Sequence, residues 1–159
     1  MANYVGFVKA IENYAHGKVM NRAALANIRK GLSPHNRRAS EEYLAKFCDI
    51  RDDHDRNIFA VVGGMMATSS NKKSYREGNF GMSMHKFRKN NMGNSSGIDM
   101  RMKRILNART GDELSRILVP IARLISGSHI DYLKLLSDMH NWNEEIRLAW
   151  AAAYYMGEY

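Results

Sequence analysis

The sequence predicts an all-α protein of about eight or nine helices packed as two small helical subdomains. Apolar residues recur with helical spacing through most of the chain, and no segment alternates apolar and polar residues as a half-buried strand does. Glycine and proline fall mainly between these periodic segments, where they end helices. The length of 159 residues suits one compact domain or two smaller units. We expect a helical subdomain with a polar loop over residues 1–80 and a helical bundle over residues 81–159.

Four helices are expected in the first half of the chain, each with one apolar stripe. The second stops near Gly31 and Pro34, Ser40 opens the third, and Gly63 with Gly64 weakens the fourth. A polar loop over residues 69–81 follows. The four stripes are, in order, Tyr4, Val8, Ile11 and Ala15; Leu25, Ile28 and Leu32; Leu44 and Phe47; and Ile58, Val62, Met65 and Met66.

The second half carries clearer helix boundaries. Thr110 to Glu113 reads Thr-Gly-Asp-Glu, a capping box in which the threonine hydroxyl and the glutamate each accept a backbone amide proton. Pro120 is expected to kink the helix that follows, because proline lacks the amide proton and clashes with the preceding turn. Asn143 is placed to cap the last helix. The apolar stripes are Ile98, Met102, Ile105 and Leu106; Leu114, Ile117, Leu118, Ile121 and Ile125; Tyr132, Leu135, Leu136 and Met139; and Ile146, Trp150, Ala153 and Tyr154.

The formal net charge of +8 is distributed unevenly along the chain. Residues 22–38 hold five cations and no acid, and residues 72–104 hold nine cations against Glu77 and Asp99. Two concentrated basic blocks favour a polyanionic partner, with solvated loops as the simpler alternative.

The cysteine content and the hydrophobic runs indicate a soluble, cytoplasmic protein. Cys48 is the single cysteine, so no internal disulfide forms, in agreement with a reducing compartment. Lys9, Glu12 and Lys18 interrupt any secretory signal in the first twenty residues. The longest uncharged run is shorter than the ~20 residues that span a bilayer. We expect no contact with a membrane.

Two stretches invite a catalytic interpretation and favour a structural one. His54-Asp55 is similar to a His-Asp metal-binding dyad. A simpler explanation of this acidic stretch is that Asp52 or Asp53 caps the fourth helix. Cys48 lies near His54, yet its apolar neighbours indicate a buried, unreactive thiol. No Gly-rich phosphate loop, pair of catalytic carboxylates or CxxC spacing occurs. We therefore expect no enzyme, no metal and no cofactor.

The basic residues indicate contact with nucleic-acid backbone. Arg101 and Arg104 are three residues apart, so they share a helix face away from the apolar stripe. Such cations are expected to bind phosphates without reading bases. The candidate nucleic-acid-binding residues are Arg22, Arg29, Lys30, Arg37, Arg38, Lys86, Arg88, Lys89, Arg101, Lys103 and Arg104.

A helix-turn-helix transcription factor is the alternative binding hypothesis. Residues 23–47 combine a helix, a loop, a helix and many cations. The break over residues 31–39 is longer than the turn of 3–4 residues in that motif. Arg37 and Arg38 lie in the break, where they are poorly placed for a recognition helix.

Several segments from residue 80 onward carry a family resemblance through their order and spacing. They are "GMSMHKF", "MRMKRILNA", "ELSRILVPIARLI", "IDYLKLLSDMHNW" and "IRLAWAAAYY", and "AALANIRKG" adds a weaker match in the first half. In these segments the chain resembles the CasB family, the small subunit of the type I-E CRISPR complex called Cascade. Arg101 occupies the position of a family arginine, and Arg29 with Lys30 matches a family basic pair.

The resemblance implies a helical protein without catalytic activity that lies as a pair along Cascade. Its implied partners are single-stranded DNA, the guide RNA backbone, other Cascade subunits and a second copy of itself. Its implied role is to stabilise the opened target DNA and the displaced strand beside the guide RNA. The chain departs from the family in its last helix, which is nearly uncharged beyond Arg147, and near Val119 and Pro120, where relatives often carry a basic pair.

Overall fold

The computed structural model describes residues 2–157, and all regular structure in that range is helical. The expected all-α class is confirmed. The α-helices are α1 (Tyr4–His16), α2 (Arg22–Arg29), α3 (Glu41–Leu44), α4 (Asp53–Thr68), α5 (Phe80–Lys89), α6 (Ser95–Leu106), α7 (Gly111–Leu118), α8 (Tyr132–His140) and α9 (Glu144–Met156). Short 3₁₀ segments are η1 (Lys30–Leu32), η2 (Arg37–Ser40), η3 (Met92–Asn94) and η4 (Val119–Ile121).

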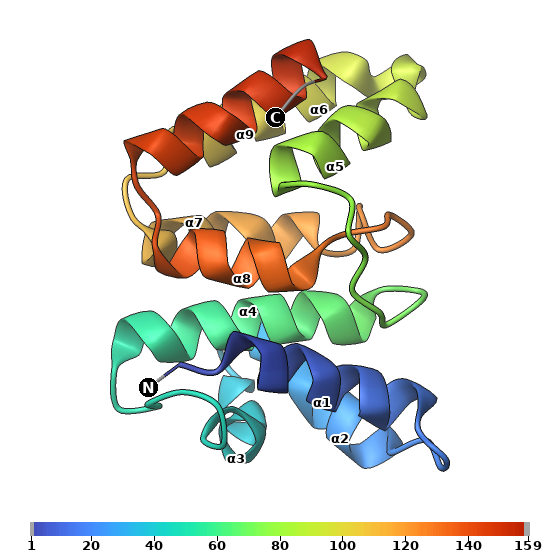
Figure 1. Cartoon of the computed structure of the whole chain (residues 1–159), viewed down its shortest axis with the longest axis vertical. Helices are drawn as coiled ribbons and strands as arrows, with labels where there is room; N and C mark the ends of the chain where they lie inside the picture. Colours follow the sequence, from blue (N-terminus) through green and yellow to red (C-terminus); the bar gives the residue numbers. More distant parts are fainter. Residues whose placement is uncertain (1, 158–159) are drawn as a thin grey trace.

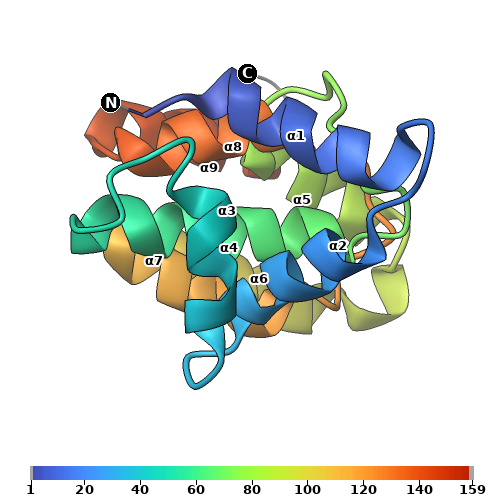
Figure 2. The same ribbon diagram turned by 90° about the horizontal axis from the view of Figure 1, so that it is seen from below.

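The helices stack in layers along the long axis of the molecule (Figure 1). Helices α1, α2 and α3 lie at one end, α4 follows, α7 and α8 form the next layer, and α5, α6 and α9 lie at the other end. A view along that axis shows α6, α7 and the loop after α2 on one side of the molecule (Figure 2). We call this side the α6–α7 side.

Helix α4 is the centre of the fold. Each residue from Ile58 to Ala67 is buried, because α1 and α2 pack on one side of α4 while α7 and α8 pack on the other. Gly63 and Gly64 permit this packing. A Cβ at either position would lie 2.6 Å from Phe7 or Leu32 respectively, well inside van der Waals contact. The two glycines therefore bring α1 and η1 close to α4, although glycine lowers helix propensity.

One continuous apolar core runs through both halves of the chain. It includes residues of the first helix such as Phe7 and residues of the last such as Trp150 and Tyr154. The expected division at residue 80 states that the two parts of the chain form separate subdomains, and it stays a prediction.

The polar loop between α4 and α5 is fastened on both sides. The Ser74 amide donates to Glu12 Oε2 at 3.0 Å, and the Ser74 hydroxyl accepts from the Tyr132 amide at 2.8 Å. The Tyr75 amide donates to the Ile130 carbonyl at 3.0 Å. Residues 70–79 thus connect α1 to the start of α8 as a strap.

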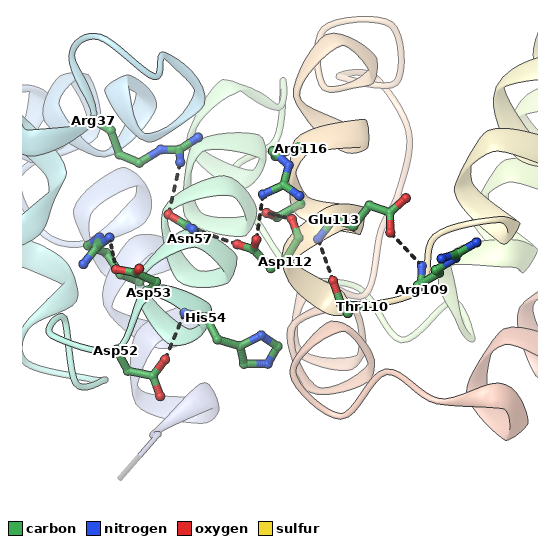
Figure 3. Close-up of polar contacts among 12 residues, drawn as sticks. Arg37, Asp52, Asp53, His54, Asn57, Arg109, Thr110, Asp112, Glu113 and Arg116 are labelled. Atoms are coloured by element: carbon green, nitrogen blue, oxygen red, sulfur yellow. Dashed lines mark hydrogen bonds and ion pairs between the residues drawn. The ribbon is translucent and has the colours of Figure 1, made fainter.

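The expected caps are confirmed. The Thr110 hydroxyl accepts from the Glu113 amide at 3.0 Å, and Glu113 Oε2 accepts from the Arg109 amide at 3.0 Å (Figure 3). Asn143 caps α9 by accepting from the Ile146 amide at 2.9 Å. Asp52, one of the two aspartates considered, caps α4.

The structure corrects one helix boundary and adds one helix. The apolar pattern from Leu114 to Ile125 is not one kinked helix, because α7 ends at Leu118 and Pro120 lies in η4. Proline has no amide proton to continue the helix, so the chain turns there. Helix α5 was not expected from apolar spacing, and it begins one residue after Asn79, whose side chain accepts from the Met82 amide.

Replacing Trp150 with alanine is expected to lower the free energy of unfolding by about 3–5 kcal/mol, because it opens a cavity in the core. Trp150 is 0% exposed, packs against Phe80 and Trp142, and donates to Asp138 Oδ2 at 2.8 Å. Leu148→Ala on the same helix is the matched control, since Leu148 is 53% exposed. Chemical denaturation measures both variants, and equal losses would contradict the packing described for α9.

Candidate nucleic-acid interface

Helix α6 presents unpaired cations to solvent. Ile98, Met102 and Ile105 are buried, whereas Lys103 and Arg104 are exposed and Arg101 is half-buried. None of these three cations forms an ion pair with another described residue. The helix therefore carries positive charge that the protein itself does not neutralise.

The cations of α5 are divided between the protein's own acids and solvent. Lys86 Nζ lies 2.6 Å from Glu77 Oε2. Arg88 donates to both carboxylate oxygens of Asp99, at 2.9 Å from Nε and 3.3 Å from Nη2. Lys89 is exposed and has no ion-pair partner among residues 2–157. Of the three expected basic residues on this helix, only Lys89 is unpaired.

Asp99 holds α5, α6 and α9 together. Besides the two bonds from Arg88, its Oδ1 accepts a short hydrogen bond from the Tyr154 hydroxyl. The hydrogen bonds from Arg88 and then from Tyr154 lower the pKa of the Asp99 carboxyl below its ordinary value. Burial raises the pKa of Tyr154, and the bond to Asp99 raises it further. Arg88 thus fixes the placement of α6, which carries Lys103 and Arg104.

Among the cations of residues 22–38, Arg37 forms hydrogen bonds within the protein. Its Nε donates to the Gly31 carbonyl at 2.8 Å, and its Nη1 donates to Asn57 Oδ1 at 3.3 Å. Asn57 in turn donates to Asp112 Oδ1 at 2.7 Å, which links η2, α4 and α7 (Figure 3). Burial lowers the pKa of the Arg37 guanidinium. Arg22 and Arg38 are exposed.

Arg29 and Lys30 line a groove together with Arg123, a residue that the sequence analysis did not select. The groove lies between the α2–η1 segment and the η4 turn and has a volume of about 560 Å³. Three cations and no carboxylate line it, so we call it the cationic groove. Its remaining lining residues are Ala26, Leu32, Ser33, Thr68, Val119 and Pro120.

The sequence signal that could have identified Arg123 is Pro120, because a proline can end a helix and so place Arg123 on the turn that follows. The apolar spacing from Leu114 to Ile125 predicts one helix that includes this arginine. Because α7 ends at Leu118, Arg123 instead lies on an exposed turn that faces α2 and η1.

The two unpaired groups of cations lie at different levels of the same side. The cationic groove joins the segment after α2 to the end of α7, and α6 lies beyond α7 along the long axis (Figures 1 and 2). We therefore treat the unpaired cations as two clusters, one in the groove and one on α6, and both elements lie on the α6–α7 side.

The geometry around Cys48 and His54 gives neither a nucleophile nor a metal centre. Burial, followed by the charge of Asp55, raises the pKa of the Cys48 thiol to about 12, so the thiol stays protonated. His54 Nε2 donates to the His140 carbonyl at 3.2 Å. Within residues 2–157, no group of three His, Cys, Asp or Glu side chains is placed to hold a metal ion.

His140 forms hydrogen bonds to two helices from the first half of the chain. Its Nε2 donates to Asp55 Oδ1 at 2.6 Å, and its Nδ1 accepts from the Tyr4 hydroxyl at 2.5 Å. These bonds link α8 to α4 and to α1. His54 and Asp55, which the sequence analysis considered as a metal dyad and interpreted as structural, thus connect helices.

In the segment considered as a helix-turn-helix, the helix after the break is too short to serve as a recognition helix. Arg37 and Arg38 belong to the 3₁₀ segment η2, and the helix that follows, α3, has 4 residues and begins with two glutamates. A recognition helix needs several turns with polar side chains directed at base edges.

No described helix is both long enough and apolar enough to span a membrane.

Comparison with known proteins identifies this all-helical chain as a CRISPR-associated protein. The model of the family "CRISPR-associated protein Cse2" matches residues 21–155. The chain belongs to the Cse2 (CasB) family, the type I-E small-subunit family, and the expected membership is confirmed. This is a family of CRISPR structural subunits that is not known for enzymes. No curated protein sequence matches the chain.

Solved structures of the same family share the fold. A Cse2-family protein from Thermus thermophilus superposes with a TM-score of 0.71 at 20% identity, over 98% of this chain and 99% of that one. A second structure from that organism, titled CasB, gives 0.69 at 20% identity over 98% and 99% of the two chains. CasB of M. ruber gives 0.66 at 24% identity over 94% and 92%.

Asp99→Asn is expected to lower the melting temperature most near neutral pH. The folded carboxyl has a lowered pKa, so its charged form adds stability above about pH 4, and this stability is lost as the pH falls through the folded pKa. The gap between wild type and variant should therefore narrow toward about pH 2. Thermal unfolding followed by circular dichroism at several pH values measures it. Glu145→Gln, at an exposed glutamate without an ion pair among the described residues, is the control, and a gap independent of pH would contradict the assigned role.

Cys48 is expected to resist alkylation by iodoacetamide at neutral pH in the folded protein and to react fully once the protein is unfolded. The thiol is 7% exposed and its pKa is raised to about 12, so thiolate is scarce and poorly accessible. Mass spectrometry with and without denaturant measures the modification. Rapid modification of the folded protein would show that Cys48 is neither buried nor protonated as described.

Proposed function

We propose that this protein is a non-catalytic subunit of a type I-E CRISPR surveillance complex that holds nucleic-acid backbone on its α6–α7 side. The observation that carries the proposal is the cationic groove, where Arg29, Lys30 and Arg123 converge without a carboxylate. Unpaired cations on α6, a helix on the same side of the molecule, are proposed as a second point of contact. Membership of the Cse2 family supports the assignment to such a complex.

The mode of binding follows from the chemistry of the two clusters. Lysine and arginine that lack an acidic partner attract phosphates and release condensed counterions when they bind them. Such contacts position a strand without reading its sequence. In guide-directed complexes the base pairing of the guide carries specificity, which leaves backbone contacts to the protein. The proposed task is to stabilise the opened target DNA, including the displaced strand, beside the guide RNA.

The candidate residues divide into contacts and supports. Arg29, Lys30, Lys89, Arg101, Lys103 and Arg104 are proposed to contact phosphates, joined by Arg123, with Arg22 and Arg38 as exposed extensions. Lys86 is paired with the half-buried Glu77, so it is proposed to support the site rather than to contact a phosphate. Arg37 and Arg88 act on binding through the fold, because each holds other elements in place.

The proposed protein partners are other subunits of the complex and a second copy of this chain. Helix α9 offers one face for such contacts, since Leu148, Tyr155 and Met156 are 53%, 58% and 65% exposed. Exposed apolar side chains gathered on one helix are typical of a protein-binding face. The proposed location is the cytoplasm, where guide RNA and invading DNA meet.

Removing three cations from the α6–α7 side is expected to weaken binding to single-stranded DNA and to flatten its salt dependence. About five phosphate contacts give a slope of log affinity against log salt near −3.5, and losing three leaves about −1.4. The variant is Arg29→Ala, Lys30→Ala, Arg104→Ala, and fluorescence anisotropy with a labelled 30-nucleotide strand at several salt concentrations measures it.

The matched control removes the same charge elsewhere. Lys9→Ala, Lys18→Ala, Lys46→Ala changes three exposed lysines that form no ion pair within the described chain. Equal losses in the two triple variants would show that net charge alone drives binding and would overturn the proposed surface. Both variants should keep the melting temperature of the wild type, since exposed substitutions change stability by less than about 0.5 kcal/mol.

Membership of a complex is tested by co-purification with the other subunits and a guide RNA, followed by crosslinking to an opened DNA target. The wild type is expected to co-purify and to crosslink to one strand of the opened target. The variant Arg29→Ala, Lys30→Ala, Arg104→Ala is expected to co-purify, because its protein-binding surfaces are intact. It is expected to crosslink less, because it lacks three of the proposed phosphate contacts.

A further inference from the structure

A second cavity adjoins the cationic groove and differs from it in chemistry. It has a volume of about 520 Å³ and lies between α5 and the turn that follows η4. The ring of Phe87 and the side chain of Leu124 supply apolar surface. Its other lining residues are polar or small and comprise Glu77, Ser83, Lys86, Asn90, Asn91, Gly127, Ser128 and His129.

The charges of this cavity cancel. Lys86 Nζ lies 2.6 Å from Glu77 Oε2, and these are the lysine and the carboxylate that line it. The cationic groove has three cations and no carboxylate, which suits a phosphate. A cavity with balanced charge suits a neutral polar group instead, because a phosphate would meet the carboxylate of Glu77.

The cavity has hydrogen-bonding groups that the fold does not use. The Asn90 amide and the Ser128 hydroxyl make no side-chain hydrogen bond among the described residues. Asn91 Nδ2 donates to the Phe87 carbonyl at 2.8 Å, which leaves its Oδ1 as an acceptor. A flat apolar surface beside free amide donors and acceptors matches a nucleobase, which has an aromatic face and a polar edge.

The two cavities open on either side of one turn. Arg123 lines the cationic groove, and the next residue, Leu124, lines the second cavity. Because successive residues of this turn line the two cavities, we place the nucleotide that adjoins an Arg123-bound phosphate at the second cavity.

We propose that this second cavity, here called the base pocket, receives one unpaired nucleobase of the strand bound on the α6–α7 side. The inference rests on the proposed function and names its ligand class as single-stranded nucleic acid. The base lies against Phe87 and Leu124, and its edge meets the amides of Asn90 and Asn91. A base in a duplex cannot enter, since its face is stacked and its edge is paired.

The test compares oligothymidine with an abasic deoxyribose-phosphate strand of the same length and charge. Wild-type protein is expected to bind oligothymidine at least about five-fold more tightly, the factor to which the lower end of stacking energies, ~1 kcal/mol per base, converts. Phe87 packs against the core, so its replacement can unfold the protein. Gly127→Leu avoids this problem, because a Cβ at Gly127 meets no atom within 4 Å, and the variant is designed to occupy part of the pocket that Gly127 lines.

Gly93→Leu is the matched control. A Cβ at Gly93 also meets no atom within 4 Å, and Gly93 does not line the base pocket. Gly127→Leu is expected to bind both strands with the affinity that the wild type shows for the abasic strand, whereas Gly93→Leu keeps the preference for oligothymidine.

Each alternative outcome has one meaning. Equal wild-type affinity for the two strands overturns the base pocket and leaves the proposed function standing. A preference for oligothymidine that persists in Gly127→Leu also overturns it, because the bases then stack elsewhere. Failure to bind either strand overturns the proposed function itself.

Discussion

The complete burial of α4 is the constraint on which the rest of the structure depends. Ten successive residues from Ile58 to Ala67 are buried, so helices must cover α4 on every side. Gly63 and Gly64 set how closely α1 and η1 approach, and α7 with α8 closes the opposite side. This arrangement brings the end of α7 near α2, which creates the cationic groove from two parts of the chain that lie some ninety residues apart. The candidate site is thus a consequence of how the core is covered.

Positive charge serves two purposes in this protein. Some cations stabilise the fold, as Arg88 does through Asp99 and Arg37 does through the Gly31 carbonyl. Others are left without an acidic partner, as on α6 and in the cationic groove. The first group helps to place the second, because the bonds of Asp99 tie α6 to α5 and α9 in addition to the packing of its apolar face in the core. A change in binding after substitution of Arg88 would therefore report altered geometry rather than a lost phosphate contact.

Apolar spacing and capping residues predicted most of the helices, because each depends on residues close in sequence. Helix α5 escaped this reasoning because its buried face uses Gly81 and Ser83 beside its methionines, which gives a weak apolar stripe. The sequence revealed where cations concentrate along the chain, but it did not reveal which of them form ion pairs with the protein's own acids. Arg88 and Asp99 are eleven residues apart and meet only because α5 and α6 pack together. Arg123 was missed for the same reason, since its partners in the groove come from α2 and η1.

The strap over residues 70–79 bears on the separation of the two proposed phosphate-binding clusters. Ser74 connects Glu12 on α1 to the start of α8, and the core continues beneath it through every layer. The strap thus ties the first layer to the middle layer, and the continuous core connects both to the layer that contains α6. In the proposed function, such a body would accept a strand only where its phosphates match the separation of the groove and α6.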